Sequence, residues 1–218
     1  MNNEKQYSKG PYGLMFHYFH DNKKYKRSQG SISKDDFENI LKKIGLTNIL
    51  PAEKWAEKAI NNHLGKNDIC ITFDDGLLAQ YDIARPVLNK YKLTAFWFVN
   101  SAPLVGENVF LEVFRRFRNE FFISMEEFYN NFFSNALDSE YEKKISKGLE
   151  SFPKNYLSEF KFYTYNDRKF RYVRDKILEK NEYENIMISL IQAKGLNVTD
   201  LAKDLWLEKK HLIQLKMK

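Results

Sequence analysis

Two adjacent aspartates, Asp74 and Asp75, directly follow an apolar, β-branched run that ends at Phe73. Such a run predicts a buried strand, and in parallel α/β folds ligands bind beyond the carboxyl ends of the strands. Two neighbouring carboxylates repel each other unless a proton or a cation offsets their charge. Their type and position therefore indicate a candidate functional site, where a divalent metal ion would offset the repulsion between the carboxylates.

The segment Asp74-Asp75-Gly76 has a second interpretation as an ordinary turn. Aspartate side chains accept hydrogen bonds from nearby backbone groups, and glycine adopts a positive φ without steric cost. The motif by itself leaves both interpretations open, so the surrounding elements have to decide between them.

His17 lies in a strand that the sequence predicts over residues 13–19, and His20 is taken as its continuation by one residue. Side chains alternate between the two faces of a strand, so a separation of three puts these imidazoles on opposite faces. We therefore expect them to be poor joint ligands of a metal ion.

The remaining histidines are expected to be structural. His63 lies near a predicted helix end, where a partly positive side chain suits the helix dipole. His211 lies in a helix predicted over residues 201–217, whose expected inner face consists of Leu205, Leu212 and Leu215.

Strands and helices alternate along the first half of the chain. Three apolar runs predict strands: 13–19, 68–73 and 94–99. Two amphipathic segments predict helices: 33–44 and 51–64, the latter with Trp55, Ala59 and Ile60 on its inner face. A third helix should begin between Asp82 and Arg85, because Pro86 is tolerated only in a first turn. This alternation indicates a parallel α/β sheet or barrel.

The second half of the chain has a different pattern. Aromatic residues from Phe110 to Phe133 recur at steps of three and four, which predicts amphipathic helices. An aromatic stripe at this spacing is most often a packing face, so we expect it to form the core of a separate helical element.

The residues around the two aspartates resemble the polysaccharide deacetylases, the NodB-type enzymes of carbohydrate esterase family four. The resemblance extends from about Leu14 to Ser101, and its most specific part is Thr72-Phe73-Asp74-Asp75-Gly76. It also includes these segments: Phe16-His17-Tyr18, Ile32-Ser33 to Phe37, Ala84-Arg85-Pro86-Val87-Leu88, Tyr91, and Thr94-Ala95-Phe96-Trp97-Phe98-Val99.

The resemblance implies metal-dependent hydrolysis of N-acetyl groups on a carbohydrate. In that scheme Asp74 is the general base that takes a proton from the attacking water, and Asp75 is a carboxylate ligand of zinc or a similar divalent ion. His17 is implied to be a substrate-binding residue on the barrel wall, facing the pocket. Two histidine ligands come from an H-x-x-x-H motif in the family, and this sequence contains no such motif.

The fold implied is α/β: an irregular (β/α) barrel of the polysaccharide deacetylase type, incomplete here, with a large helical insertion. Residues 1–106 would form the N-terminal part of the barrel, residues 107–204 the helical insertion, and residues 205–218 a helix leading back to the barrel. Since H-x-x-x-H is missing, we expect the sequence to be the N-terminal part of a longer deacetylase or a truncated product. A partial barrel has open sheet edges, through which we expect self-association.

Composition narrows the class of protein. The chain has 218 residues, of which 43% are hydrophobic and 16% aromatic, and this is enough to bury a core. The net charge of +6 is spread along the chain, so we expect no nucleic-acid partner. No apolar run approaches the roughly 18 residues of a membrane-spanning helix. The polar N-terminus and the single cysteine, Cys70, lead us to expect a cytoplasmic protein.

Two functions from different classes remain. The first is a deacetylase acting on an N-acetylated sugar or glycan, in carbohydrate metabolism or surface-polysaccharide biosynthesis, of which this chain could be an inactive fragment. The second is a non-catalytic module that binds carbohydrate or protein on a degenerate deacetylase fold. A phosphohydrolase with an aspartyl nucleophile would require Asp-x-Asp-Gly-Thr, which the residues from Asp74 to Leu77 do not supply.

Overall fold

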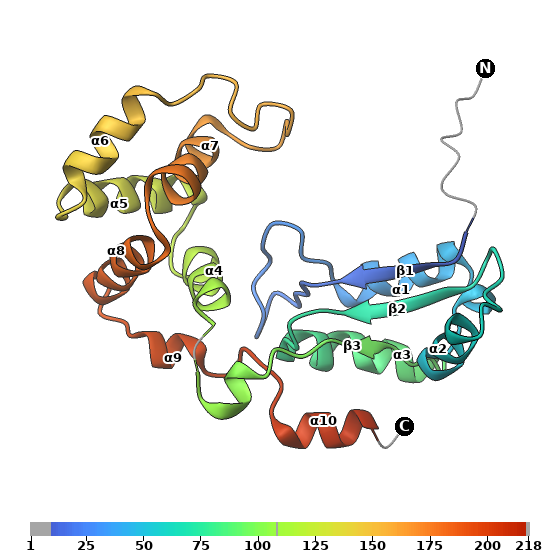
Figure 1. The fold of residues 1–218 in the computed structure, drawn as a ribbon. Helices are drawn as coiled ribbons and strands as arrows, with labels where there is room; N and C mark the ends of the chain where they lie inside the picture. Colours follow the sequence, from blue (N-terminus) through green and yellow to red (C-terminus); the bar gives the residue numbers. More distant parts are fainter. Residues whose placement is uncertain (1–9, 108, 217–218) are drawn as a thin grey trace. The chain divides into compact units, whose positions relative to one another are not determined.

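The computed structural model describes residues 10–107 and 109–216. The chain divides into two compact units: unit 1, Met1–Glu107 with Asp204–Lys218, and unit 2, Asn108–Lys203. The sheet lies in unit 1, and the described part of unit 2 is built from helices (Figure 1). Among the described residues, no helix is both long and apolar enough to cross a bilayer.

Unit 1 is an α/β structure built on a parallel sheet in the order β1-β2-β3. Its strands are β1 (Tyr12–Phe16), β2 (Ile69–Phe73) and β3 (Phe96–Trp97). The register pairs Leu14 with Ile71 and Phe16 with Phe73, so these side chains project from the same face. Parallel strands at matching register bring the carboxyl ends of β1 and β2 to the same edge of the sheet.

Two of the strands are shorter than the sequence predicts. β1 ends at Phe16 instead of residue 19, because the chain then leaves the sheet and Phe19 forms an isolated bridge with Ile32. β3 has two residues instead of six, and the next backbone N–H, that of Phe98, donates to the carbonyl of Phe73 at 2.8 Å. Neither His17 nor His20 therefore lies in a strand.

The α-helices in the described part of unit 1 are α1 (Lys34–Ile44), α2 (Ala52–Ile60), α3 (Arg85–Lys90) and α10 (Lys209–Lys216). Short 3₁₀ turns cover Leu46–Asn48 and Ala102–Val105. One core joins α1, β2 and α3, and its central residues are Phe37, Leu41, Ile71, Phe73, Val87 and Leu88. The covered face of the sheet is thus the face that carries Ile71 and Phe73, whereas Met15 on β1 is 61% exposed.

Helix α1 confirms the prediction for residues 33–44. Ser33 and Asp36 form a reciprocal capping box, which satisfies backbone N–H groups that a helix N-terminus leaves unpaired. Gly45 ends the helix at φ 96°, a conformation that residues with a side chain rarely adopt. Helix α2 is shorter than the predicted 51–64, and Ile60 at its end is 81% exposed, so the expectation that Ile60 faces inward is wrong.

The helix after Asp75 begins earlier than predicted. Helical backbone starts at Leu78 and continues through a π-helical turn, Gln80–Ala84, into α3. In the wider turn the N–H of Arg85 donates to the carbonyl of Gln80, five residues back. Pro86, which has no N–H, thus still falls in the first turn of α3, where the missing donor costs least.

The prediction of one continuous helix over residues 201–217 is wrong. Helix α9 ends at Ala202, an extended segment follows, and α10 begins at Lys209. The extended segment pairs with the turn after β2: Leu207 N–H donates to Gly76 O at 2.8 Å, and Leu78 N–H donates to Leu205 O at 2.8 Å. These backbone bonds replace the helical ones, so Leu205 is not on the inner face of a helix.

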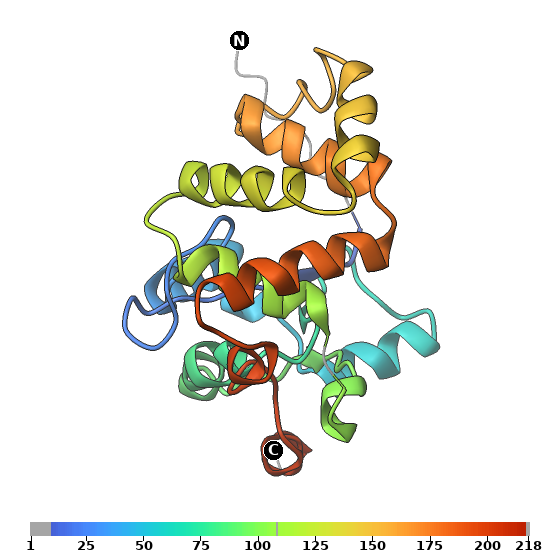
Figure 2. The ribbon, with the colours of Figure 1, turned by 90° about the vertical axis from the view of Figure 1, so that its left-hand side faces the viewer.

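Unit 2 contains α4 (Phe110–Glu120), α5 (Met125–Leu137), α6 (Glu142–Glu150), α7 (Tyr165–Tyr172), a π-helical turn (Val173–Ile177), α8 (Lys180–Ala193) and α9 (Val198–Ala202). Helix α5 packs on α6, α7 and α8 (Figure 2). The expected aromatic packing face is confirmed, because Phe117, Phe128 and Phe132 are fully buried. The Arg118 guanidinium lies 5.8 Å and 5.7 Å from the ring centroids of Phe128 and Phe170, which stabilises this aromatic core by cation–π attraction.

Helix α6 approaches the π-helical turn so closely that only glycine fits at position 148. A Cβ on Gly148 would lie 2.6 Å from Ile177 Cδ1 and 2.7 Å from Ile177 Cγ1. Alanine is the better helix former by about 1 kcal/mol, but overpacking costs about 1–3 kcal/mol. We therefore expect Gly148→Ala to lower the thermal unfolding temperature of unit 2, measured by far-ultraviolet circular dichroism.

Two observations control this experiment. Lys147→Ala changes an exposed residue of the same helix and should leave the transition in place. All three tryptophans, Trp55, Trp97 and Trp206, belong to unit 1, so their fluorescence should report an unaltered transition there. A Gly148→Ala transition at or above the wild-type temperature would contradict the close packing.

Glu38 links α1 to α3 and to the residue that follows it. Its Oε1 accepts hydrogen bonds from Lys42 Nζ at 2.7 Å, Lys90 Nζ at 2.8 Å and Tyr91 Oη at 2.6 Å. Lys42, then Lys90 and Tyr91, lower the pKa of Glu38 to about 2, from a usual 4.5. Because the pKa of Glu38 is lower in the folded than in the unfolded chain, its ionised carboxylate stabilises the fold at pH values above the unfolded pKa. This contribution is lost as the pH falls through the folded pKa.

We expect the unfolding free energy of Glu38→Gln to fall short of the wild-type value by a constant amount above pH 4.5, and the difference to shrink as the pH falls toward about 2. Urea unfolding followed by tryptophan fluorescence across this range measures it. Glu53→Gln, at an exposed position of α2, is the matched control. A difference that did not vary between pH 6 and 2 would show that Glu38 acts by something other than its charge.

Candidate functional site

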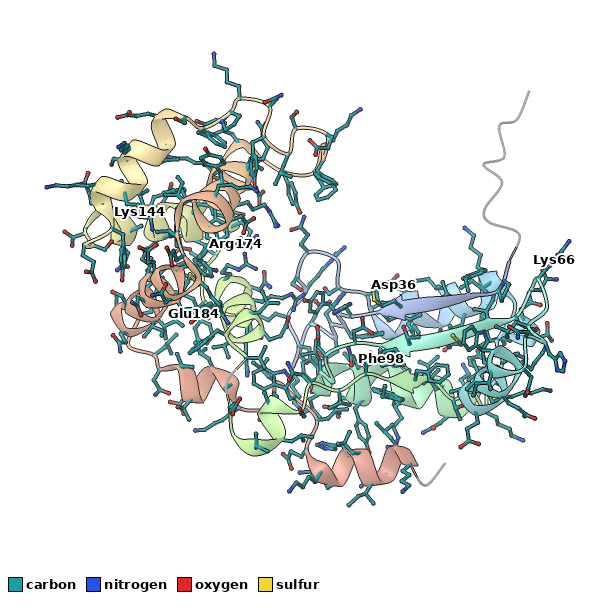
Figure 3. All side chains as sticks on the ribbon, in the orientation of Figure 1. Asp36, Lys66, Phe98, Lys144, Arg174 and Glu184 are labelled. Carbon is teal, nitrogen blue, oxygen red and sulfur yellow. The ribbon has the colours of Figure 1, made fainter. Side chains whose placement is uncertain are left out.

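The candidate site lies at the carboxyl edge of the sheet. Asp74 and Asp75 directly follow β2, and His17 directly follows β1. Asp74 N–H donates to Phe16 O at 3.4 Å, which continues the pairing of the two strands by one step. Phe98, labelled in Figure 3, follows β3 at the same edge. Three consecutive strand ends therefore meet where a parallel sheet places its ligands.

His17 and Asp75 form a hydrogen-bonded pair, with 2.9 Å between His17 Nε2 and Asp75 Oδ2. An ionised carboxylate only accepts, so the imidazole Nε2–H donates. The two side chains are 30% and 41% exposed, so a ligand can reach them from solvent. A ligand at this edge of the sheet would therefore meet the two side chains as a pair.

Asp75 holds an unusual backbone conformation, with φ 69°. The left-handed region costs a residue with a Cβ roughly 1–2 kcal/mol, although aspartate tolerates it better than most residues. Gly76 follows at φ 62°, and a Cβ there would lie 3.1 Å from Val99 Cγ1. Two successive left-handed residues reverse the chain immediately after β2 and turn the Asp75 side chain toward His17.

The side chain of Gln80 connects the residues that follow β1 and β2. It is fully buried, and its Nε2 donates to His17 O at 2.9 Å and to Asp74 O at 2.7 Å, while its Oε1 accepts from Leu77 N–H at 3.1 Å. Buried backbone groups without partners are costly, and one side-chain amide satisfies three of them. Gln80 therefore fixes the loop after β1 to the loop after β2.

The other histidines do not join this site. The buried imidazole of His20 bonds through Nδ1 to Ser31 Oγ at 3.0 Å, so His20 and His17 have different partners. The reason given for this from the sequence, alternation along a strand, does not apply, because β1 ends before both residues. His63 is exposed, and His211 accepts from Glu208 N–H through Nδ1 at 2.9 Å.

The metal expectation can be tested against the residues present. A zinc site takes three or four protein ligands of the His, Cys, Asp or Glu type. Within residues 10–107 and 109–216, no group of three or more such side chains is arranged to hold a metal ion. Asp75 and His17 supply two ligands at most, so the described residues do not form a complete zinc site.

A small cavity of unit 1 lies elsewhere. It is lined by residues of α3, of the connection from α3 to β3, of β3 and of α10, among them Arg85, Leu88, Thr94, Trp97 and Leu215. None of the three candidate site residues lines it. The candidate site is therefore an accessible edge of the sheet and not this cavity.

Comparison with known proteins gives few matches. No family model and no curated protein matches the chain. A solved structure titled "Probing the structure and mechanism of de-N-acetylase from Aggregatibacter actinomycetemcomitans" matches with a TM-score of 0.36 and 23% sequence identity. The match covers 44% of this chain and 39% of that chain.

Sequence reasoning missed the role of Gln80. A signal was available, because Gln80 lies between Leu77 and Ala84 at the spacing of one helix face, and the other residues of that face are apolar. A polar residue in a buried stripe requires hydrogen-bond partners. The sequence pattern does not show that these partners are backbone groups of two loops and a turn.

Replacing Gln80 by leucine keeps the approximate size of the side chain and removes its hydrogen-bonding groups. Three backbone groups then lose their partner, and we expect unit 1 to lose about 2–4 kcal/mol of unfolding free energy. Urea unfolding followed by tryptophan fluorescence measures the loss. Hydrogen exchange at the Leu77 amide should accelerate as well, because that N–H donates to Gln80.

Gln192→Leu, at an exposed position of α8, is the matched control and should change neither measurement. Wild-type exchange at Leu77 in the Gln80→Leu variant would mean that the amide is protected by another group.

Proposed function

We propose that this chain functions in the hydrolytic removal of N-acetyl groups from a carbohydrate, with Asp74, Asp75 and His17 as its site. The observation that carries the proposal is the hydrogen bond of 2.9 Å between His17 and Asp75 at the carboxyl edge of the sheet, directly beside Asp74. The resemblance of residues 72–76 to the polysaccharide deacetylases supports the same conclusion.

In this proposal Asp74 accepts the proton of the attacking water, since an ionised carboxylate at this edge can act as a general base. Asp75 orients His17 through their hydrogen bond, and His17 contacts the substrate. The loop conformation fixed by Gln80 holds the two carboxylates in a constant relation to His17.

A divalent ion such as zinc, if bound, would polarise the amide carbonyl and lower the pKa of a water molecule. Asp75 and His17 are the ligands that the described residues could offer, and two ligands fall short of a complete set. The roles given above to Asp74, Asp75 and His17 therefore do not depend on a metal ion, and a complete ligand set would need groups from outside the described residues.

A second candidate function follows from that shortage of ligands. A module that retains Asp74, Asp75 and His17 without a complete metal site could bind a carbohydrate or a protein without hydrolysing it. The partly exposed His17 and Asp75 side chains would then act as hydrogen-bonding groups for the bound molecule. Binding without turnover distinguishes this function from the first.

Acetate release from N-acetylglucosamine oligomers by the full chain, with zinc added over a range of concentrations, tests the proposal. We expect Asp74→Asn to lower the rate by about 10²–10⁴-fold, the usual contribution of a positioned general base. Asp75→Ala and His17→Asn should also lower the rate, and Asp35→Asn, an exposed carboxylate of α1, should not.

Tryptophan fluorescence establishes that each variant keeps unit 1 folded. Equal rates for the wild type and Asp74→Asn would refute the role of Asp74. If the wild type released no acetate but bound the oligomers in calorimetry, and His17→Asn abolished that binding, the second function would replace the first.

A further inference from the structure

An exposed aromatic turn lies in the loop between α6 and α7 of unit 2 (Figure 1). We call Phe160, Lys161, Phe162 and Tyr163 the aromatic tip. Phe160 is 41% exposed and Phe162 is 62% exposed, and Lys161 between them is exposed as well. Single exposed apolar residues are common on protein surfaces, but two phenylalanines around a lysine on one turn form a patch.

The aromatic tip has a defined shape. Tyr163 N–H donates to Phe160 O at 2.9 Å, which closes a turn. The ring centroids lie 5.8 Å apart for Phe160 and Phe162, 5.6 Å for Phe160 and Tyr163, and 4.5 Å for Phe162 and Tyr163. The Arg171 guanidinium lies 4.1 Å from the ring centroid of Tyr163, which fixes the tip to α7. A surface formed in advance loses little conformational entropy when it binds.

The base of the loop is anchored separately. Phe152, Tyr156 and Tyr172 pack on one another with centroid distances of 5.1–6.3 Å. Arg168 Nη1 donates to Lys154 O at 3.0 Å, which ties the loop to the first turns of α7. The loop is therefore stabilised at its base, while Phe160 and Phe162 at the tip keep their exposure.

We propose that the aromatic tip binds the surface of an anionic lipid bilayer. Phenylalanine enters the boundary between headgroups and acyl chains, and tyrosine and lysine beside it suit the headgroup level. Lys161 would meet anionic headgroups, and Glu159, directly before the tip, carries the opposite charge. This inference is independent of the proposed hydrolytic function.

Other occupants fit the aromatic tip less well. A sugar that stacks on aromatic rings also requires several hydrogen-bond partners for its hydroxyl groups, and within the aromatic tip only Lys161 and Tyr163 carry polar side-chain groups. The nearby Thr164 hydroxyl is engaged with Glu126 at 3.3 Å and with Asp167 at 3.2 Å. The combination of exposed apolar rings with lysine therefore favours a lipid surface.

Co-sedimentation of the full chain with vesicles tests the proposal. One vesicle consists of phosphatidylcholine mixed with phosphatidylglycerol, and the other of phosphatidylcholine alone. We expect stronger binding to the mixed vesicle and a reduction of roughly tenfold or more in Phe160→Ser/Phe162→Ser, because burial of a phenylalanine ring is lost twice. Lys161→Glu should weaken binding to the mixed vesicle and leave binding to phosphatidylcholine unchanged.

Ile60→Ser is the matched control, since Ile60 is 81% exposed at the end of α2 and should contribute nothing. Phe162→Ser alone serves as the variant if the double one lowers the helix content of unit 2.

Three results would overturn the proposal. The first is no binding to either vesicle, and the second is equal binding by the wild type and the serine variants, which would mean adsorption through net charge alone. The third is self-association of the wild type without vesicles that the serine variants abolish, because the tip would then bind a second copy of the chain.

Discussion

The side-chain amide of Gln80 is the interaction on which the candidate site depends. A parallel sheet leaves the backbone groups of its loops without partners where the strands end, and burial makes such groups costly. Gln80 donates to the loops after β1 and β2 and accepts from the turn that follows. A fully buried polar side chain thus replaces ladder hydrogen bonds and fixes where His17 and Asp75 can meet.

The turn after β2 serves two purposes at once. Its left-handed residues, Asp75 and Gly76, reverse the chain and direct the Asp75 side chain to His17. Its backbone also pairs with the extended segment around Trp206, through bonds from Leu207 to Gly76 and from Leu78 to Leu205. The segment after unit 2 therefore returns to unit 1 and contributes to the shape of the turn that carries the aspartates.

Unit 2 is stabilised by the packing of aromatic side chains between helices. Its helices bury phenylalanines against one another, and basic side chains such as Arg118 and Lys194 lie over the rings. A cation beside an aromatic ring loses part of its hydration, and the attraction to the ring offsets part of that loss. This explains how a helical unit rich in lysine and arginine can have an aromatic interior.

The sequence alone determined the elements whose signals are local. Ser33 and Gly45 set the ends of α1, the apolar run before Asp74 gave β2, and the spacing of Phe117, Phe128 and Phe132 indicated a helical core. Only the tertiary structure decided that His17 bonds to Asp75, which lies 58 residues away, and that Gln80 supports both. The helix predicted over 201–217 is interrupted in the tertiary structure, because the backbone there pairs with Gly76 and Leu78. The spacing of Leu205 and Leu212 gave no sign of this pairing. Periodicity and capping concern neighbours along the chain, whereas these contacts join distant segments and leave no pattern in either one.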